Sequence, residues 1–464
     1  MLRSLSFSHA MVATALLAAL LLTLFPIAPH PTAFSYAASV VVITLVLWST
    51  GVLPPFLTGL LFFALVSVFG LLPPEQLFAG FGSTAVWMVI SGFVIGSAIT
   101  SSKLGDRLAA VLSPLLTASY PKLIGGLVFT AMALGFVMPS SGGRAVVLIP
   151  IGLALAERVG FEPGSAGRLG VATALAAACN MPSFAVLPSN LPNMILAGSS
   201  ESLYGIHIGY AEYLLLHFPI LGMLKSILIV VLVLVVFPAR IAPQCQLPIE
   251  TIKTTSAATQ QKKVAVVMGI TLLLWVTDTL HGANPAWVGL VAAVVLMMPK
   301  AGAVDPKSFN TVVDFGTVIF VAAALGLGTL VNVSGIGSAV GQGFTQLMET
   351  DNGGSFGDFI SLSLMATLTG VVATTPSVPT VLSPMAAELA GASGLSLPAV
   401  LMTQVVGFST VIFPYQVAPL IMAMQLSKEP LSQLLKIIIP LALITIFLLM
   451  PLDYLWWRLL GWVN

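Results

Sequence analysis

Charge is what this sequence has least of: Asp, Glu, Lys and Arg together make up 7% of its 464 residues. Soluble domains carry about 25% charged residues, so a soluble fold is excluded. The formal net charge is only +1 and there is no basic run, which argues against a nucleic-acid partner. The two cysteines lie in an apolar segment and a polar linker, a poor disulfide pair, and the five histidines show no metal-ligand spacing.

Long apolar stretches are the main content of the chain, because 58% of its residues are hydrophobic. A helix that crosses a bilayer needs roughly 20 apolar residues, and such stretches recur along almost the whole chain. The sequence therefore predicts an all-α polytopic membrane protein with about 11 transmembrane helices in the lipid bilayer of a bacterial inner (plasma) membrane. The apolar segment within residues 1–33 exceeds a signal-peptide core and is interpreted as a retained transmembrane helix. The predicted spans lie near residues 9–28, 34–50, 54–71, 84–101, 168–199, 210–237, 264–281, 285–299, 315–334, 397–425 and 431–460.

Two pairs of shorter apolar segments do not fit a scheme of full crossings. Residues 121–156 and 357–391 each contain two apolar stretches separated by Gly, Pro, Ser or Thr. We interpret them as re-entrant hairpins, which at membrane depth must be buried in protein or line a wet cavity. Each hairpin precedes a long segment, 168–199 or 397–425, whose prolines cannot all lie in an unbroken helix. Each hairpin is therefore expected to be followed by a broken helix.

An internal repeat lies on either side of the polar linker 239–263. The linker carries Lys and Arg against a single acid, which predicts a cytoplasmic position. Motifs of residues 34–238 recur in the same order and at a nearly constant offset in residues 264–464: PFLTGLLFF as PAWVGLVAA, FGST as FGTV, and VVLIPIGLALAERVG as TVLSPMAAELAGASG. If each repeat crosses the membrane five times, the second is inverted relative to the first. Inverted repeats with interrupted helices at matching positions indicate a secondary transporter whose substrate site lies near the midplane.

The tips of the two hairpins carry small hydroxyl residues. Glycine permits close approach of the backbone, and the start of a half-helix offers free N–H groups and a positive dipole end to an anion. Hydroxyls and backbone carbonyls can instead coordinate a sodium ion. The alternative is that both tips are ordinary turns between helices at the membrane surface. The predicted substrate-binding residues are Ser140, Ser141, Gly142, Gly143, Arg144, Thr374, Thr375 and Ser377.

Further polar residues lie beside the prolines of the two broken helices. Backbone groups that a proline frees from helical hydrogen bonds need new partners, and amide or hydroxyl side chains can provide them or hold an ion. Four broken elements that converge at one depth predict a polar cavity with many donors and few charges. For each single residue, the alternative is local capping of a kink. The predicted ion-binding residues are Asn180, Ser183, Asn190, Ser409 and Thr410.

Together these motifs resemble the divalent anion/sodium symporters, a family that carries dicarboxylates, citrate or sulfate. The likeness covers nearly the whole chain and includes FGSTAVWMVISGFVIGSAITSSKLGDRLA, the hairpin ending LIPI, SNLPN where the family typically has Gly-Thr-Pro-Pro-Asn, and the ending FPYQVAPLIMAMQL. The resemblance implies a homodimer with a scaffold from the early helices of each repeat and a transport part that moves like an elevator. It also implies a sodium ion as the coupling ion and no cofactor besides.

The chain departs from this family at the hairpin tips. The family usually has Ser-Asn-Thr there, and those side chains bind the substrate carboxylates and help to hold sodium, whereas residues 140–142 read Ser-Ser-Gly and residues 374–376 read Thr-Thr-Pro. Arg144 stands just beyond the first tip, and an arginine can bind carboxylate or sulfate through two parallel hydrogen bonds. We therefore expect Arg144 to contact the anion and to replace part of the role of sodium. The alternatives are that it snorkels to the cytoplasmic surface or pairs with Glu157, but about 20 Å of helix separates that pair.

The sequence thus predicts a secondary active transporter of small divalent anions (dicarboxylate, citrate or sulfate) that is coupled to sodium. The alternative is an arsenite or sodium/proton antiporter of the same broad superfamily. A proton antiporter needs buried carboxylates, and the predicted cavity has none. An enzyme such as an intramembrane protease is not expected, because the predicted spans hold no central pair of aspartates and no histidine patterned with Ser140 or Ser141.

Overall fold

The computed structural model describes residues 7–28, 30–102, 118–138, 140–241, 255–299, 302–345 and 355–463. Throughout these residues the ordered elements are helices, and none of them is a strand. Within the same residues, seven helices are long and apolar enough to cross a membrane, or eight when one strongly bent pair counts as a span. The predicted all-α membrane class is confirmed. The predicted number of spans is not, because several predicted crossings are short or broken helices.

Four helices of the first half begin at serine caps, and several end where proline or glycine interrupts them. Ser83, Ser119 and Ser165 each accept a hydrogen bond from a backbone N–H of the first turn that follows. After α9, Pro182 and Pro188 start two short 3-10 turns, so the predicted helix 168–199 is broken before α10 begins. The helices of this half are α1 (Phe7–Leu24), α2 (Thr32–Thr50), α3 (Pro55–Val68), α4 (Pro74–Leu77), α5 (Thr84–Ser101), α7 (Tyr120–Val137), α8 (Ser141–Arg158), α9 (Ala166–Asn180), α10 (Leu191–Tyr204), α11 (Tyr210–His217) and α12 (Lys225–Val236).

The second half repeats this order of elements. A helix pair joined by a tip is again followed by a broken helix, interrupted here at the 3-10 turn Pro414–Gln416, and then by a long helix with a π-helical segment. The first nine residues of α13 belong to the predicted linker 239–263, of which residues 242–254 lie outside the described part. The helices are α13 (Thr255–Val276), α14 (Asp278–His281), α15 (Pro285–Met297), α16 (Phe309–Val312), α17 (Phe315–Val333), α18 (Ile336–Thr345), α19 (Phe356–Ala373), α20 (Ser377–Leu382), α21 (Ala386–Ser393), α22 (Leu397–Phe408), α23 (Ala418–Ser427), α24 (Leu431–Ile444) and α25 (Met450–Leu459).

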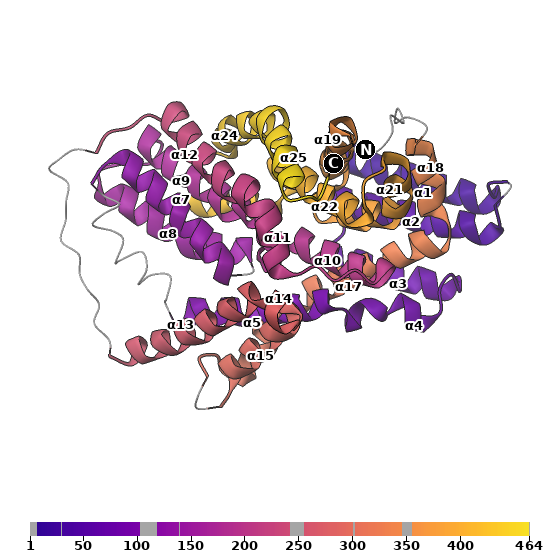
Figure 1. Cartoon of the computed structure of the whole chain (residues 1–464), viewed down its shortest axis with the longest axis horizontal. Coiled ribbons are helices and arrows are strands. Elements are labelled where there is room, and N and C mark those ends of the chain that lie inside the picture. Colours follow the sequence, from indigo (N-terminus) through magenta and orange to yellow (C-terminus); the bar gives the residue numbers. More distant parts are fainter. Residues whose placement is uncertain are drawn as a thin grey trace, which may run out of the picture.

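Two hydrophobic cores organise these helices. One core consists mainly of side chains from α7 to α12 and from α19 to α25. The other consists mainly of side chains from α2, α3, α5 and α17, together with part of α10 and α15. In Figure 1, α7, α8, α9 and α12 gather at one end of the long axis, and α1 to α4 lie at the other end with α18 and α21. The helices α2, α3, α5 and α17, which come before the two hairpins in the chain, thus form a core separate from that of the hairpins and breaks.

Close backbone contacts hold each core together. A side chain at Gly59 of α3 would place its Cβ 2.9 Å from the Cβ of Ala323 on α17, so these two helices pack without space for a larger residue. Gly407 of α22 is tighter still, because an added Cβ would lie 2.6 Å from the carbonyl oxygen of Ser363 on α19. This fixes the end of α22 against α19 just before its break.

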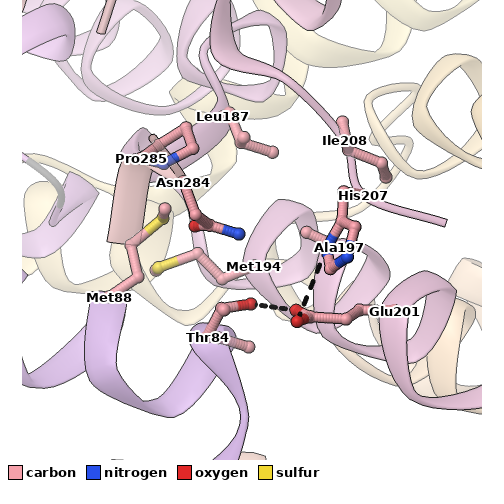
Figure 2. A pocket seen from close by; sticks show the side chains of 11 residues that line it. Thr84, Met88, Leu187, Met194, Ala197, Glu201, His207, Ile208, Asn284 and Pro285 are labelled. Atoms are coloured by element: carbon pink, nitrogen blue, oxygen red, sulfur yellow. Dashed lines mark hydrogen bonds and ion pairs between the residues drawn. The ribbon is translucent and has the colours of Figure 1, made fainter. Parts of the chain in front are cut away.

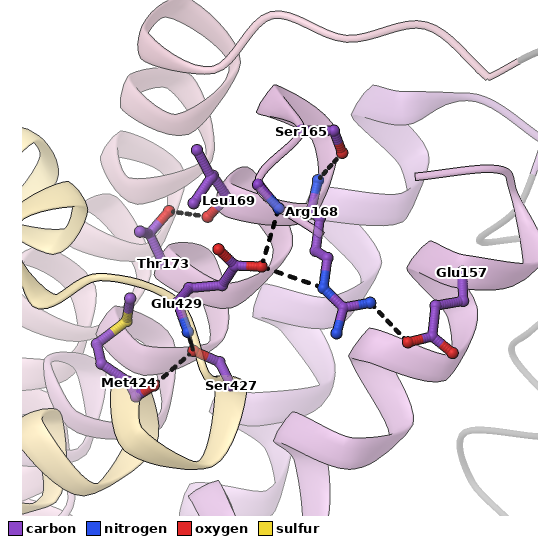
Figure 3. Close-up of polar contacts among 9 residues, drawn as sticks. Glu157, Ser165, Arg168, Leu169, Thr173, Met424, Ser427 and Glu429 are labelled. Atoms are coloured by element: carbon purple, nitrogen blue, oxygen red, sulfur yellow. Dashed lines mark hydrogen bonds and ion pairs between the residues drawn. The ribbon is translucent and has the colours of Figure 1, made fainter. Parts of the chain in front are cut away.

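An ion-pair cluster joins the two halves of the chain (Figure 3). Arg168 at the start of α9 binds Glu157 of α8 at 2.6 Å and Glu429, which follows α23, at 3.1 Å. The Arg168 and Glu429 side chains are 9% and 5% exposed, whereas that of Glu157 is 62% exposed. Of these two pairs, the buried one with Glu429 connects the halves, and removing either of its partners would leave an uncompensated buried charge.

Candidate functional site

A cavity of about 670 Å³ lies where the two hairpin tips meet the helices of the second core. Its walls combine Ser140 and Ser141 of the first tip, residues 374–377 of the second tip, and residues of both helix breaks. The opposite wall is formed by α2, α3, α5 and α17. Binding cavities for small molecules typically measure about 300–1,000 Å³, so this one can hold a small organic anion.

The first tip is built by a serine cap. Ser140 has an extended backbone and its Oγ accepts a hydrogen bond from the Gly143 N–H at 3.1 Å, which starts α8 at Ser141. Gly142 faces Met422 of α23 so closely that an added Cβ would lie 2.9 Å from the methionine methyl. Ser140, Ser141 and Gly142 line the cavity as predicted, whereas Gly143 lies behind the wall.

Arg144 lies behind the first tip and does not line the cavity. It is 0% exposed, and its Nε and Nη2 donate to the Cys179 carbonyl at 3.1 and 2.7 Å. Its Nη1 donates to the Ser189 hydroxyl at 2.8 Å and to the Met138 carbonyl. The breaks on either side leave these carbonyls without helical partners, and buried carbonyls require donors. Two expectations are thereby corrected: Arg144 does not contact the cavity directly, and it does not snorkel to the surface.

The second tip is held by its backbone instead. The Thr375 N–H and hydroxyl both donate to the Gln416 carbonyl at 3.1 Å, which ties the tip to the break after α22. Thr374 adopts φ 69° and ψ 159°, a conformation that is costly for a residue with a Cβ. Thr374, Thr375 and Ser377 all line the cavity, as predicted. Such strain at a tip that faces a cavity is typical of a functional position.

The predicted ion-binding residues fall into two groups. Asn190 lines the cavity, where its amide oxygen caps α10 and its nitrogen donates to the Ser183 hydroxyl at 3.0 Å. The other four do not line the cavity. Their side chains donate to carbonyls of their own broken helix, which matches the alternative of local capping of a kink. These four residues are Asn180, Ser183, Ser409 and Thr410.

The sequence analysis missed two buried charged residues behind the second break. Lys225 on α12 is 1% exposed, and its ammonium donates to the Ser409 carbonyl at 2.8 Å. Asp453 on α25 is 0% exposed, and neither of its carboxylate oxygens has a hydrogen-bond partner. A signal existed in the sequence, since each is an isolated charge within an apolar span, and such charges are usually functional.

Gln416 was also absent from the predicted site although it lines the cavity. Its amide oxygen accepts the N–H groups of Ile412 and Phe413, both at 2.8 Å, so its orientation is fixed. The carboxylate of Asp314 lies at the opposite wall and is engaged in capping α17. Hydroxyls, amides and backbone N–H groups thus dominate the polar part of the cavity, an arrangement suited to an anion that arrives with its own charge.

A second hollow, of about 20 Å³, separates α5, α10 and the start of α15 (Figure 2). The Thr84 hydroxyl donates to the Glu201 carboxylate, and His207 Nδ1 lies 3.5 Å from the same carboxylate. This space holds about one water molecule. It is therefore too small for an organic substrate.

Solved structures share the fold at low sequence identity. The Alcanivorax borkumensis YdaH transporter matches 83% of this chain and 87% of its own, with 14% identity and a TM-score of 0.54. Neisseria gonorrhoeae MtrF, described within a class of antimetabolite efflux pumps, matches 95% of this chain and 97% of its own, with 14% identity and a TM-score of 0.52. These likenesses show that the fold is shared with membrane transporters, and they do not identify a substrate.

Sequence relatives agree with this class. A protein of Cupriavidus necator described as a membrane protein is 26% identical over 401 residues, which cover 83% of this chain and 77% of that protein. The sodium-dependent dicarboxylate transporter SdcS of Staphylococcus saprophyticus is 27% identical over 181 residues, 37% of this chain and 34% of that protein. The family model described as citrate transporter matches residues 44–408. This chain therefore belongs to the citrate transporter family and is an integral transporter of the bacterial plasma membrane, not an enzyme.

Proposed function

We propose that this protein is a secondary transporter of small carboxylates, such as citrate or a dicarboxylate, which bind in the cavity between the two tips. The observation that carries the proposal is the meeting of both tips and both helix breaks at one cavity of about 670 Å³. Family membership and the name of the SdcS relative support carboxylates as the substrate class. Sulfate, the third anion that the family resemblance implies, is the weaker candidate, because these names mention only carboxylates.

Recognition of a carboxylate is assigned to donors of the two tips. Ser141 opens α8, so the positive end of this helix faces the cavity together with the hydroxyl. The hydroxyls of Ser140 and Ser377 and the amide of Gln416 add donors from separate elements. Each hydrogen bond to an ionised carboxylate contributes about 1.5–3 kcal/mol. Several of them would offset the loss of hydration of the anion.

Movement of one core against the other is the proposed transport step. The cavity has a wall from each core, so relative sliding of the cores would carry the tips and their anion along the α2, α3, α5 and α17 face. This elevator-type motion, a homodimer built on the second core, and sodium as a driving ion are the parts of the proposal that come from the family resemblance. We do not extend the proposal to an arsenite or sodium/proton antiporter, because the buried carboxylate of Asp453 lies outside the cavity wall. Asp314 does line the cavity, against the expectation that it has no carboxylate, but this side chain is exposed and caps α17.

Uptake into proteoliposomes tests the proposal. Purified protein should accumulate labelled citrate or succinate under an imposed sodium gradient, proton gradient or membrane potential, and unlabelled carboxylates should compete. Labelled sulfate should accumulate less. Liposomes with folded protein that take up neither carboxylate under any of these gradients would overturn the proposed function.

A further inference from the structure

The ends of the two broken half-helices create a need for positive charge inside the protein. α9 ends at Asn180 and α22 at Phe408, and both ends are buried. The last carbonyls of a helix lack N–H partners and carry the negative end of its dipole. In transporters with broken helices, such carbonyls can bind the coupling cation. The question is what satisfies these two ends here.

Arg144 satisfies the first end. Two of its nitrogens bind the Cys179 carbonyl at the end of α9, and the third binds the Ser189 hydroxyl, on the far side of the break. Among the described residues, no carboxylate forms an ion pair with Arg144. Its charge is therefore balanced by the dipoles of the break alone, and that is the environment that a small bound cation would have.

Lys225 satisfies the second end. Its ammonium lies 2.8 Å from the Ser409 carbonyl and 3.5 Å from the Ser409 hydroxyl, immediately after α22. Lys225 belongs to α12, whereas the break whose carbonyl it binds follows α22. A hydrated ion from bulk water cannot reach the Ser409 carbonyl without displacing the ammonium, since Lys225 and Ser409 are both almost completely buried.

Two irregular helix segments lie close in the chain to Lys225 and Asp453. The π-helical segment Phe218–Leu224 directly precedes Lys225, and the π-helical segment Thr445–Leu449 ends four positions before Asp453. π-helical turns often mark functional sites. The Trp457 indole lies beside Asp453, and neither carboxylate oxygen reaches hydrogen-bond geometry with a partner. A buried carboxylate in this state can still bind a cation.

We propose that Arg144 and Lys225 are built-in cations that occupy, at the two helix breaks, the places of dissociable coupling ions. The inference rests on the proposed carboxylate transport but replaces its sodium coupling: the transporter depends little on sodium, because covalently attached charges already fill both carbonyl sites. Removing Lys225 should open the second site to sodium. The Ser409 carbonyl and the two free oxygens of Asp453 would then supply its ligands.

Sodium dependence of the unmodified protein is the first test. Labelled citrate uptake should change by less than about twofold when external sodium is replaced by potassium at constant membrane potential, whereas loss of one bound ion would cost roughly tenfold or more. The melting temperature of the purified protein should also be equal in sodium and potassium chloride. A steep sodium requirement together with specific stabilisation by sodium would overturn the inference.

The Lys225→Met variant is the second test. We expect its uptake to fall by roughly tenfold in potassium and to recover in sodium, and its melting temperature to rise in sodium chloride relative to potassium chloride. Lys436→Met, which removes an exposed lysine from neighbouring α24, is the matched control and should respond to neither salt. Transport by Lys225→Met at the parental rate in potassium would overturn the inference.

A double variant covers the case in which Lys225→Met does not fold. If the unpaired Asp453 prevents Lys225→Met from folding, the Lys225→Met/Asp453→Asn variant removes both charges. It should then lose citrate uptake by roughly tenfold in both salts, since it has neither a built-in cation nor a carboxylate to recruit one; parental uptake by this variant would contradict the inference. Complete absence of both citrate and succinate uptake by the parent would refute the proposed function. The melting temperatures in the two salts would still decide the inference.

Discussion

The two tips occupy the same place in the order of elements but are stabilised differently. The first is fixed by one side chain, Arg144, whose guanidinium reaches both sides of the break between α9 and α10. The second is fixed by main-chain contacts, in which the Gln416 carbonyl accepts two hydrogen bonds from Thr375, and by the unusual backbone of Thr374. Substitutions should therefore disturb the first tip through lost side-chain donors and the second through backbone conformation.

The largest effect is expected at Arg144. Arg144→Gln removes most donors from two buried carbonyls and the Ser189 hydroxyl, and each buried polar group left unsatisfied costs about 1–3 kcal/mol. The variant should melt at a clearly lower temperature, and Arg144→Lys should recover only part of the difference. Arg158→Gln at the far end of α8 is the matched control and should change stability little. Equal melting temperatures for Arg144→Gln and the parent would show that Arg144 does not hold the tip.

Blocking both tips should abolish transport without unfolding the protein. In the Ser141→Leu/Thr375→Leu variant, bulky side chains enter the cavity from both sides and remove two hydroxyls. Citrate uptake should fall to background, while the elution profile stays that of a folded protein. The free energy of unfolding should drop by only about 1 kcal/mol, because the Thr375 hydroxyl no longer donates to the Gln416 carbonyl. Ser101→Leu, at the exposed end of α5, is the control and should transport normally. Uptake by the double variant at the parental level would remove the tips from the site.

Relief of backbone strain at Thr374 should raise the stability of the protein, whereas the Arg144 substitution lowers it. Thr374→Gly allows φ 69° without a Cβ clash, so we expect about 1 kcal/mol of added stability. The same change in the regular helix, Thr369→Gly, should instead destabilise by about 1 kcal/mol. Thermal unfolding of the two variants beside the parent gives both signs at once. A lower stability for Thr374→Gly would mean that threonine contacts outweigh the strain at this tip.

The smallest effect is expected for the cap of the first tip. Ser140→Ala loses the hydrogen bond from the Gly143 N–H, which costs about 1 kcal/mol. Ser140→Thr retains a capping hydroxyl and should be close to neutral. Thermal unfolding measures the stability of both Ser140 variants. If Ser140→Ala lost as much stability as Arg144→Gln, the cap would hold the first tip as strongly as the Arg144 side chain does, which contradicts the expectation.

Much of this fold is predictable because apolar periodicity and proline act locally. The two breaks, the serine and threonine tips and their convergence at one cavity follow from Pro182, Pro188, Pro414 and the repeat of motifs. Family membership was likewise predicted from motifs and is confirmed by the match over residues 44–408. The inverted relation of the two repeats, the homodimer and the sodium site stay predictions.

The role of Arg144 was not predictable from its neighbours in sequence. Its acceptors are carbonyls at positions 138 and 179 and a hydroxyl at position 189, and only packing brings them together. Lys225 and Asp453 lie still farther apart in the chain, on α12 and α25. Sequence can flag an isolated charge in an apolar span as functional, but its partner depends on which helices become neighbours.

The central claim, that a carboxylate binds between the two tips, is tested most directly by protection from alkylation. Single cysteines are introduced as Ser141→Cys and Thr375→Cys in a background whose native cysteines, Cys179 and Cys245, are replaced. Citrate should slow the reaction of both cysteines with a small maleimide, and a cysteine at Ser101 should react at an unchanged rate. If saturating citrate alters neither rate while the protein still transports it, the substrate binds elsewhere and the account of the cavity is wrong.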